Sequence, residues 1–149
     1  MKCISIRQPW AWLIVRPDLA AEARLAAMYE REIKTIENRC WPTSYRGPIL
    51  IHAAKGMTRA EYDEANDPLW ASGGPTIELP PMADLQRGGI VGRATLVDCI
   101  APTMANSWWH VPGQFGLLLN GIEPLPFTPA KGALGIFEMP WPIQGACPC

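Results

Sequence analysis

The chain has 149 residues, 48% of them apolar and 18% charged, which suits one globular domain with a buried core and excludes a disordered chain. Its formal net charge of −1 excludes a general basic field for holding nucleic acid, so such a partner would need a local patch and stacking. Sixteen prolines and thirteen glycines predict short elements joined by many turns.

The five cysteines are scattered until the C-terminal pair Cys147 and Cys149, and no cysteine or histidine spacing is typical of zinc. We therefore expect no metal, and the absence of phosphate-loop, dinucleotide and GxSxG motifs indicates no cofactor. The N-terminus lacks a signal-peptide core and no apolar run is long enough to cross a membrane. These features predict a protein of the reducing cytoplasm with no membrane partner.

The first elements are predicted by alternation and by proline. Residues Lys2–Ile6 alternate as in a short strand, and Pro9 then suits the start of a short helix over Trp10–Val15. Asp18 is a candidate N-cap for a second helix, which extends to about Glu30 and is rich in helix-forming residues.

Two strands and a third helix are predicted next. Residues Ile33–Arg39 have strand character, and the apolar run within Ile49–Ala54 is typical of a core strand. Thr58 and Glu61 have the spacing of a capping box, which predicts a helix to about Ala65.

The second half of the chain is predicted to be strand-rich. Residues 66–81 form a long loop in which Trp70 is a candidate anchor, and Gly89–Ile100 is a strand with a bulge at Gly92. Further strands are predicted at Gln114–Asn120, Glu123–Phe127 and Gly132–Met139. Five to seven short strands without a repeated βαβ unit favour a small α+β barrel, as one domain over 1–149 with a flexible tail at 140–149.

The stretch from Ile33 to Ala54 carries the most polar chemistry. Lys34 and Glu37 can pair only if the chain bends at the start of the strand, because residues three apart on a regular strand face opposite sides. The pair then forms either a functional site or a surface ion pair of little energetic value. The carboxylate favours the charged form of Lys34, which would hold a phosphate or carbonyl oxygen.

Side chains suited to nucleic acid surround this pair. Guanidinium groups between aromatic rings can contact phosphates and stack on bases, and an amide can hydrogen-bond a base edge. A strand-to-helix corner adds two hydrogen-bonding side chains and an aromatic ring. The candidate binding residues are Arg7, Gln8, Trp10, Asn38, Arg39, Trp41, Tyr45 and Arg46. We interpret His52 as a core histidine and His110, after Trp108 and Trp109, as a residue at the rim of a cleft.

Three blocks, ISIRQPWAWLI, IKTIENRCW and YRGPILIHAAK, followed by a GALGIFEM strand, resemble the ASCH domain family of the PUA-like superfamily. The resemblance spans roughly Ile4 to Met139 and implies a small PUA-like β-barrel of five to seven mixed strands with two or three peripheral helices. The segment of residues 16–31 is longer than the family's usual link between the first helix and the strand that carries the lysine, and we interpret it as an added or extended surface helix.

Members of that family have been linked to RNA binding, transcriptional coactivation, ribonuclease activity and hydrolysis of the amide in N4-acetylcytidine. The amide hydrolases use a lysine, a threonine three residues later and a distant glutamate. Lys34 matches the lysine, but Glu37 stands where the threonine nucleophile is needed, and Thr35 faces the opposite side of the strand.

We therefore expect a domain that binds RNA or a modified nucleobase or nucleoside in a cationic, aromatic-lined cleft. The first alternative is a hydrolase acting on a modified cytidine amide or on RNA, in which Lys34 and Glu37 would be catalytic. The second is a coactivator-like interaction module that uses Trp108 and Trp109 as an exposed anchor pair.

Overall fold

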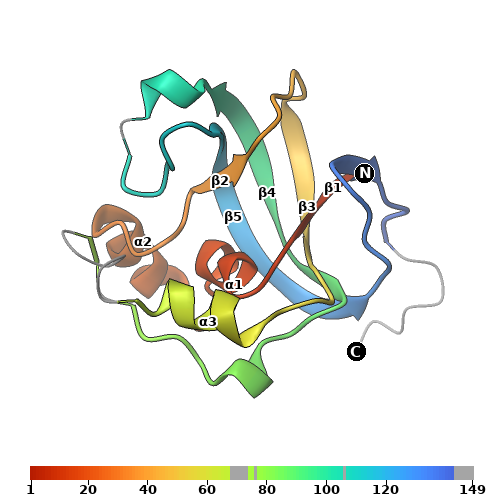
Figure 1. Cartoon of the computed structure of the whole chain (residues 1–149). Helices are drawn as coiled ribbons and strands as arrows, with labels where there is room; N and C mark the ends of the chain where they lie inside the picture. Colours follow the sequence, from red (N-terminus) through yellow and green to blue (C-terminus); the bar gives the residue numbers. More distant parts are fainter. Residues whose placement is uncertain (68–73, 76, 106, 143–149) are drawn as a thin grey trace.

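The computed structural model describes residues 1–67, 74–75, 77–105 and 107–142 (Figure 1). In chain order the elements are β1 (Lys2–Ile6), α1 (Trp10–Val15), α2 (Ala21–Tyr29), β2 (Ile36–Arg39), β3 (Gly47–Ala53), α3 (Arg59–Ala65), β4 (Gly89–Ile100), β5 (Phe115–Pro129) and β6 (Ile136–Glu138), with short 3-10 helices at Met82–Asp84 and Pro102–Met104. The predicted positions of Trp70, and of the tail from residue 143 onward, lie outside the described residues.

The strands form one six-stranded mixed sheet in the order β2-β5-β4-β3-β1-β6. β1 and β3 are parallel, and the other neighbouring pairs are antiparallel. The sheet curls around α1, which lies on its concave side (Figure 1). This architecture confirms the prediction of a small PUA-like α+β barrel.

The main core lies between α1 and the concave face of the sheet. Three of the six residues of α1, Ala11, Ile14 and Val15, pack there against apolar residues of β1, β3, β4 and β5. Gly92 lets the helix approach closely, because a Cβ at this position would lie 2.8 Å from Val15 Cγ2 and 2.8 Å from the Glu123 carbonyl oxygen. The predicted bulge is confirmed, since the register between β4 and β5 shifts between Ile90 and Gly92.

A second core lies on the opposite face of the sheet. It contains Cys3 of β1, Leu50 of β3, Ile90 of β4 and Met139, which follows β6. β3 is thus covered on both faces, because Ile49 and Ile51 point toward α1 while Leu50 points away from it. Burial on both faces explains why this strand has a continuous apolar run instead of an alternating one.

The prediction of separate strands at Gln114–Asn120 and Glu123–Phe127 is wrong. β5 is a single strand of 15 residues that bends through register shifts against β4. Its prolines are tolerated because β2 pairs with β5 only over Phe115–Leu118, which leaves the rest of that edge without a neighbouring strand among the described residues.

Other boundaries also differ from the sequence-based prediction. β2 begins at Ile36, three residues later than expected, and β6 covers only Ile136–Glu138. Ala20, not Asp18, occupies the N-cap of α2, because Asp18 instead pairs with Arg16. The capping box of α3 is confirmed.

A matched pair of leucine truncations tests this account of the core. Leu50 is 0% exposed and Leu134 is 98% exposed. Leu50→Ala should lower the free energy of unfolding by about 2–5 kcal/mol, because it opens a cavity in the second core. Leu134→Ala should change it by less than about 0.5 kcal/mol. Urea unfolding followed by tryptophan fluorescence measures both, and similar effects of the two variants would contradict the assigned burial.

Candidate functional site

The two edges of the curled sheet face each other without pairing. β2 is one edge, and β6 covers β1 only over Lys2–Ile4, so the rest of β1 has a free edge within the described part of the chain. Arg39 at the end of β2 donates a hydrogen bond from Nη2 to the Ser5 carbonyl oxygen at 2.8 Å. A side chain therefore connects the two edges of the barrel.

Lys34, Glu37 and Arg39 form a connected ionic network beside this link. Lys34 Nζ lies 3.3 Å from Glu37 Oε1 and also donates to the Ile36 carbonyl oxygen. Glu37 Oε2 lies 3.5 Å from Arg39 Nη2. The bend that this pairing requires is present, because Lys34 precedes β2 and its backbone N–H bonds to the Leu13 carbonyl of α1 at 2.9 Å.

The network is buried, which contradicts the surface ion-pair interpretation. The side chains of Lys34 and Glu37 are only 3% and 10% exposed. Burial lowers the pKa of Lys34 below its ordinary value of 10.5, and this effect outweighs the opposing one of Glu37. The expectation that Glu37 dominates the protonation of Lys34 is therefore wrong, because desolvation penalises the ammonium form.

Asn38 is used inside the protein. Its side-chain nitrogen donates to the Trp109 carbonyl oxygen at 2.9 Å, and its side-chain oxygen accepts from the Val111 N–H at 2.8 Å. Trp109 is 3% exposed and its indole N–H donates to the Arg31 carbonyl oxygen at 3.1 Å. These contacts hold the loop before β5 against β2 and contradict the expectation that Trp109 is exposed.

His110 in the same loop is also buried, at 3% exposure, instead of lying at a rim. Its Nε2 lies 2.7 Å from the Gln114 carbonyl oxygen. Its Nδ1 has no hydrogen-bond partner among the described residues.

The corner between β1 and α1 has a different set of contacts. Arg7 forms a two-point ion pair with Glu61 of α3, with N···O distances of 2.5 and 2.6 Å, and Arg7 holds the pKa of Glu61 at about 2. Gln8 is 2% exposed, donates to the Gln86 carbonyl oxygen and accepts from the Trp12 N–H. Trp10 is partly buried against the main core. Arg7 is therefore the residue of this corner that faces solvent.

Tyr45 and Arg46 lie at the opposite end of the sheet from Arg7. They precede β3, whereas Arg7 follows β1, and these two parallel strands pair over four residues, which is about 13 Å of sheet. The Tyr45 hydroxyl donates to the Pro48 carbonyl oxygen, and Arg46 donates to the carbonyl oxygens of Thr43 and Tyr45. Arg46 also pairs with Asp98 at 3.7 Å, so the polar contacts described for these two residues are with the turn and β4.

Trp41 stays close to the network. The guanidinium carbon of Arg39 lies 5.7 Å from the centre of the Trp41 ring, which itself packs partly into the main core. This distance is within the range of a favourable cation–π interaction.

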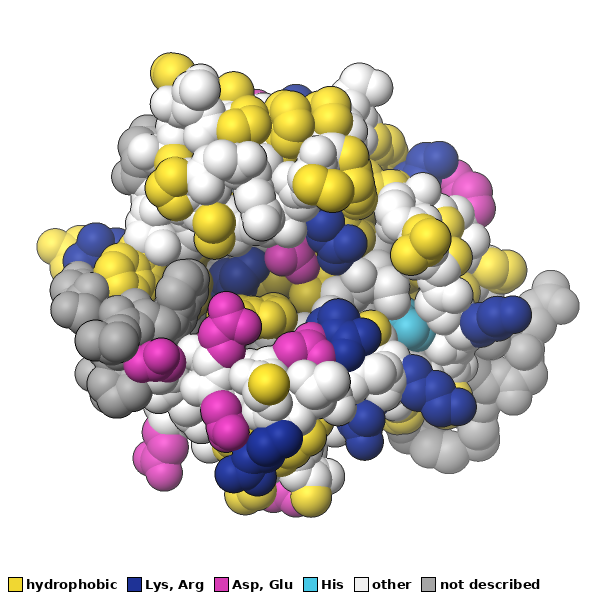
Figure 2. Space-filling model, in the orientation of Figure 1, with side chains coloured by type: hydrophobic (Ala, Val, Ile, Leu, Met, Phe, Trp, Pro, Cys, Tyr) yellow, Lys and Arg dark blue, Asp and Glu magenta, His cyan; other side chains and the backbone are white. Residues whose placement is uncertain are grey.

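A cationic pocket adjoins Arg39, and we call it the β1-edge pocket. It has a volume of about 1140 Å³. No carboxylate of the described residues lines it. Its five charged lining side chains are all basic: Arg7, Arg39, Lys55, Arg87 and Lys131. Ser5, His52 and the segment from Pro129 to Gly135 are also part of the lining. Figure 2 shows Lys and Arg side chains gathered around a histidine at the lower right of the molecule.

Three of these basic residues were not predicted from the sequence. Lys55 lies two residues after β3, Arg87 two residues before β4 and Lys131 two residues after β5. Because β3–β4 and β4–β5 are antiparallel, these three positions meet at one end of the sheet. Aligning the predicted strands as antiparallel hairpins would have placed these three residues at the same end of the sheet.

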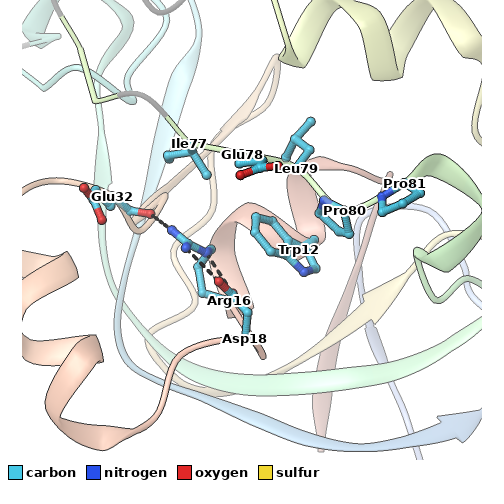
Figure 3. A pocket seen from close by; sticks show the side chains of 9 residues that line it. All are labelled: Trp12, Arg16, Asp18, Glu32, Ile77, Glu78, Leu79, Pro80 and Pro81. Atoms are coloured by element: carbon cyan, nitrogen blue, oxygen red, sulfur yellow. Dashed lines mark hydrogen bonds and ion pairs between the residues drawn. The ribbon is translucent and has the colours of Figure 1, made fainter.

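A second pocket lies beside α1 and has different electrostatics (Figure 3). Arg16, which is 6% exposed, stacks on the Trp12 ring at 4.8 Å and is neutralised by Asp18 at 2.9 Å. Glu32 and Glu78 also line this pocket. It is therefore acidic and unsuited to phosphate.

The fold and the β1-edge pocket define a small α+β barrel protein with one cationic end. The family model of the ASCH domain matches residues 30–126, and the chain belongs to the ASCH domain family. The match includes the ionic network but not Ser5, Arg7 or Lys131.

Two curated relatives are similar over 100 residues. Activating signal cointegrator 1 from Homo sapiens is 32% identical, and the protein of the same name from Mus musculus is 31% identical. In both cases the alignment covers 66% of this chain and 14% of the relative, so the chain spans a small part of those proteins.

The described part of the chain contains no helix long and apolar enough to cross a membrane. The same residues also contain no group of three or more His, Cys, Asp or Glu side chains arranged to hold a metal ion.

The lowered pKa of Lys34 predicts a pH-dependent stability. Between the folded-state pKa and 10.5, the unfolded chain binds more protons than the folded one, so stability rises with pH across this window. Lys34→Met removes the titrating group, so the rise in stability across this window should be absent from the variant. The difference in stability between the two proteins should therefore change with pH up to 10.5.

Urea unfolding of both proteins from pH 7 upward measures this difference. Glu37→Gln is the control, because it leaves the buried ammonium without its carboxylate and should destabilise the protein by about 3–5 kcal/mol. A difference between wild type and Lys34→Met that is constant with pH would contradict the assignment.

Proposed function

We propose that this protein binds single-stranded RNA, with phosphate groups held in the β1-edge pocket. The observation that carries the proposal is the gathering of five basic side chains, and of no described carboxylate, in one pocket of a chain whose net charge is −1. Phosphate contacts supply most of the sequence-independent affinity of nucleic-acid-binding proteins. Membership of the ASCH family supports a binding partner of this class.

The basic side chains differ in how freely they can bind a phosphate. The ammonium groups of Lys55 and Lys131 are exposed and have no partner among the described residues, so they can bind phosphate without breaking an existing contact. Arg87 donates from one nitrogen to the Lys55 carbonyl oxygen and keeps its other donors. Arg7 already pairs with Glu61 and therefore contributes less net positive charge.

The ionic network gives the proposed site a means to recognise a base. The network orients Arg39, which lines the pocket and supplies N–H donors that can hydrogen-bond acceptors on the edge of a nucleobase or modified nucleoside. Trp41, whose ring lies 5.7 Å from the Arg39 guanidinium, is a candidate aromatic contact for the base, as is Trp10 at the start of α1. A phosphate in the pocket and a base near Arg39 would together select a nucleotide unit.

Hydrolysis through Lys34 receives support from its lowered pKa, which favours the neutral amine that a base requires. Its position argues against that role, because Nζ is buried and bonded to the Ile36 carbonyl and to Glu37. The interaction-module alternative loses its anchor pair, because Trp109 is buried. The name of the relatives supports coactivation only for those much longer proteins.

Two double variants test RNA binding by the pocket. Lys55→Ala/Lys131→Ala removes two unpaired charges from the pocket, whereas Arg59→Ala/Arg93→Ala removes two charges that lie outside it and are paired with Asp63 and Glu123. The pocket variant should bind RNA about tenfold more weakly. The slope of log affinity against log salt should fall by about 0.7 for each phosphate that the variant no longer neutralises.

Fluorescence anisotropy with a labelled single-stranded RNA of about ten nucleotides, over a series of salt concentrations, measures both quantities. The control variant should match the wild type in affinity and slope. Equal weakening by the two double variants, or no binding by the wild type at low salt, would contradict the proposal.

A further inference from the structure

The β1-edge pocket contains a serine–histidine pair that RNA binding does not use. Ser5 of β1 and His52 of β3 are directly paired positions on neighbouring parallel strands. Ser5 Oγ lies 2.7 Å from His52 Nδ1, and His52 Nε2 lies 2.7 Å from the Ala130 carbonyl oxygen. His52 is 2% exposed, so both ring nitrogens are held in a defined position by the sheet and by the loop after β5.

The carbonyl of Ala130 fixes where the proton of the neutral imidazole lies. A carbonyl oxygen can only accept a hydrogen bond, so Nε2 of His52 must carry the N–H that donates to it. Nδ1 then has a free lone pair, and the Ser5 hydroxyl is the group that can donate to it. This is the proton arrangement of a serine whose hydroxyl is activated by an adjacent general base.

The surroundings of the pair favour attack on an anionic substrate. Ser5 is half-buried, and both it and His52 line the pocket with the five basic side chains. The Arg39 guanidinium, bonded to the Ser5 carbonyl oxygen at 2.8 Å, places positive charge beside the serine. Positive charge and N–H donors close to a nucleophile stabilise the negative charge that develops in acyl transfer.

Glycine at position 132 keeps the pair close to the loop. A Cβ there would lie 2.6 Å from Ser5 Oγ and 2.7 Å from His52 Cε1, so any side chain would push the loop off the pair. The loop therefore packs against Ser5 and His52 through Gly132, which has no side chain.

We propose that Ser5 is a nucleophile and His52 its general base, in a hydrolase acting on acyl esters of phosphate-bearing molecules. The phosphate-bearing class of substrate rests on the proposed function of the pocket. The serine chemistry rests on the Ser5–His52–Ala130 geometry alone.

The reaction has two balanced halves. In the first, Ser5 Oγ bonds to the acyl carbon, the ester C–O bond breaks, and the serine proton passes through His52 Nδ1 to the departing oxygen, which leaves as an alcohol. In the second, water gives a proton to His52 Nδ1 and its oxygen bonds to the acyl carbon. The bond to Oγ then breaks, the proton returns to Ser5, and a carboxylic acid is released.

The alternative is that the pair only ties the loop to the sheet. An activated serine reacts with an alkyl fluorophosphonate, in which Oγ displaces fluoride from phosphorus, whereas a structural serine does not. Wild-type protein should gain one phosphonyl group, which peptide mapping should place on Ser5. His52→Gln should react at least about a hundredfold more slowly, because it removes the base. Ser44→Ala, at an exposed turn serine, is the matched control and should react like the wild type.

Ester hydrolysis tests the class of substrate. The probes are 4-nitrophenyl acetate, which is neutral, and adenosine 5′-monophosphate acetylated on its ribose. Wild-type protein should hydrolyse both, and Lys131→Ala should raise KM for the phosphate-bearing ester by a larger factor than KM for the neutral ester. Hydrolysis of the neutral ester alone would overturn the assigned substrate class.

Labelling and RNA binding of the wild-type protein separate the two proposals. Absence of label on Ser5, or equal labelling of wild type and His52→Gln, overturns the nucleophile whether or not RNA binds. Labelled Ser5 in a protein that does not bind RNA supports the nucleophile and overturns the function proposed for the pocket.

Discussion

The packing of α1 into the concave face of the sheet is the constraint on which the rest of the structure depends. The helix is short and wholly apolar, and its residues Ala11, Ile14 and Val15 pack in the main core. It also receives the backbone N–H of Lys34 at the Leu13 carbonyl, which fixes where the chain enters β2. With α1 inside the curl, β2 and β1 remain separate edges, and the Arg39 side chain connects them through the Ser5 carbonyl. The proposed site lies at this connection because polar backbone groups and charged side chains are available where the sheet does not close.

The charges at this edge have two different physical roles. Lys34 and Glu37 are buried, and the desolvation cost of such a pair means that it adds little net stability even with good geometry. Its structural effect is to orient Arg39, which contacts Glu37, Trp41 and Ser5 at once. Lys55 and Lys131, by contrast, are exposed, and their positive charge is available to a ligand. Arg39 belongs to both sets, so the buried network positions one donor of the cationic pocket.

Local features of the site were predictable from the sequence, whereas the features that depend on strand direction were not. Glu37 and Arg39 lie two residues apart on β2 and therefore share one face, and Lys34 joins them because the chain bends before the strand begins. The same stretch suggested Tyr45 and Arg46, but the turn before β3 places them at the far end of the sheet from Arg7. Lys55, Arg87 and Lys131 are isolated in the sequence and meet only through the registers of two antiparallel pairs. The sequence also gives no sign that the Asn38 amide is hydrogen-bonded inside the protein, because the loop that it contacts lies more than 70 residues away along the chain.

The loop after β5 contacts both the cationic pocket and the serine–histidine pair. Three consecutive residues have separate contacts: the Ala130 carbonyl accepts from His52, the Lys131 side chain lines the cationic pocket, and Gly132 packs on Ser5. A phosphate held by Lys131 would therefore restrain the backbone that fixes the imidazole, because adjacent Cα atoms are only about 3.8 Å apart. The Ala130 N–H also bonds to the Gly88 carbonyl at 3.1 Å, which anchors this loop to the start of β4 beside Arg87. In the proposed site, phosphate binding and the orientation of the imidazole would thus depend on the same anchored segment, which is the arrangement that a preorganised site requires.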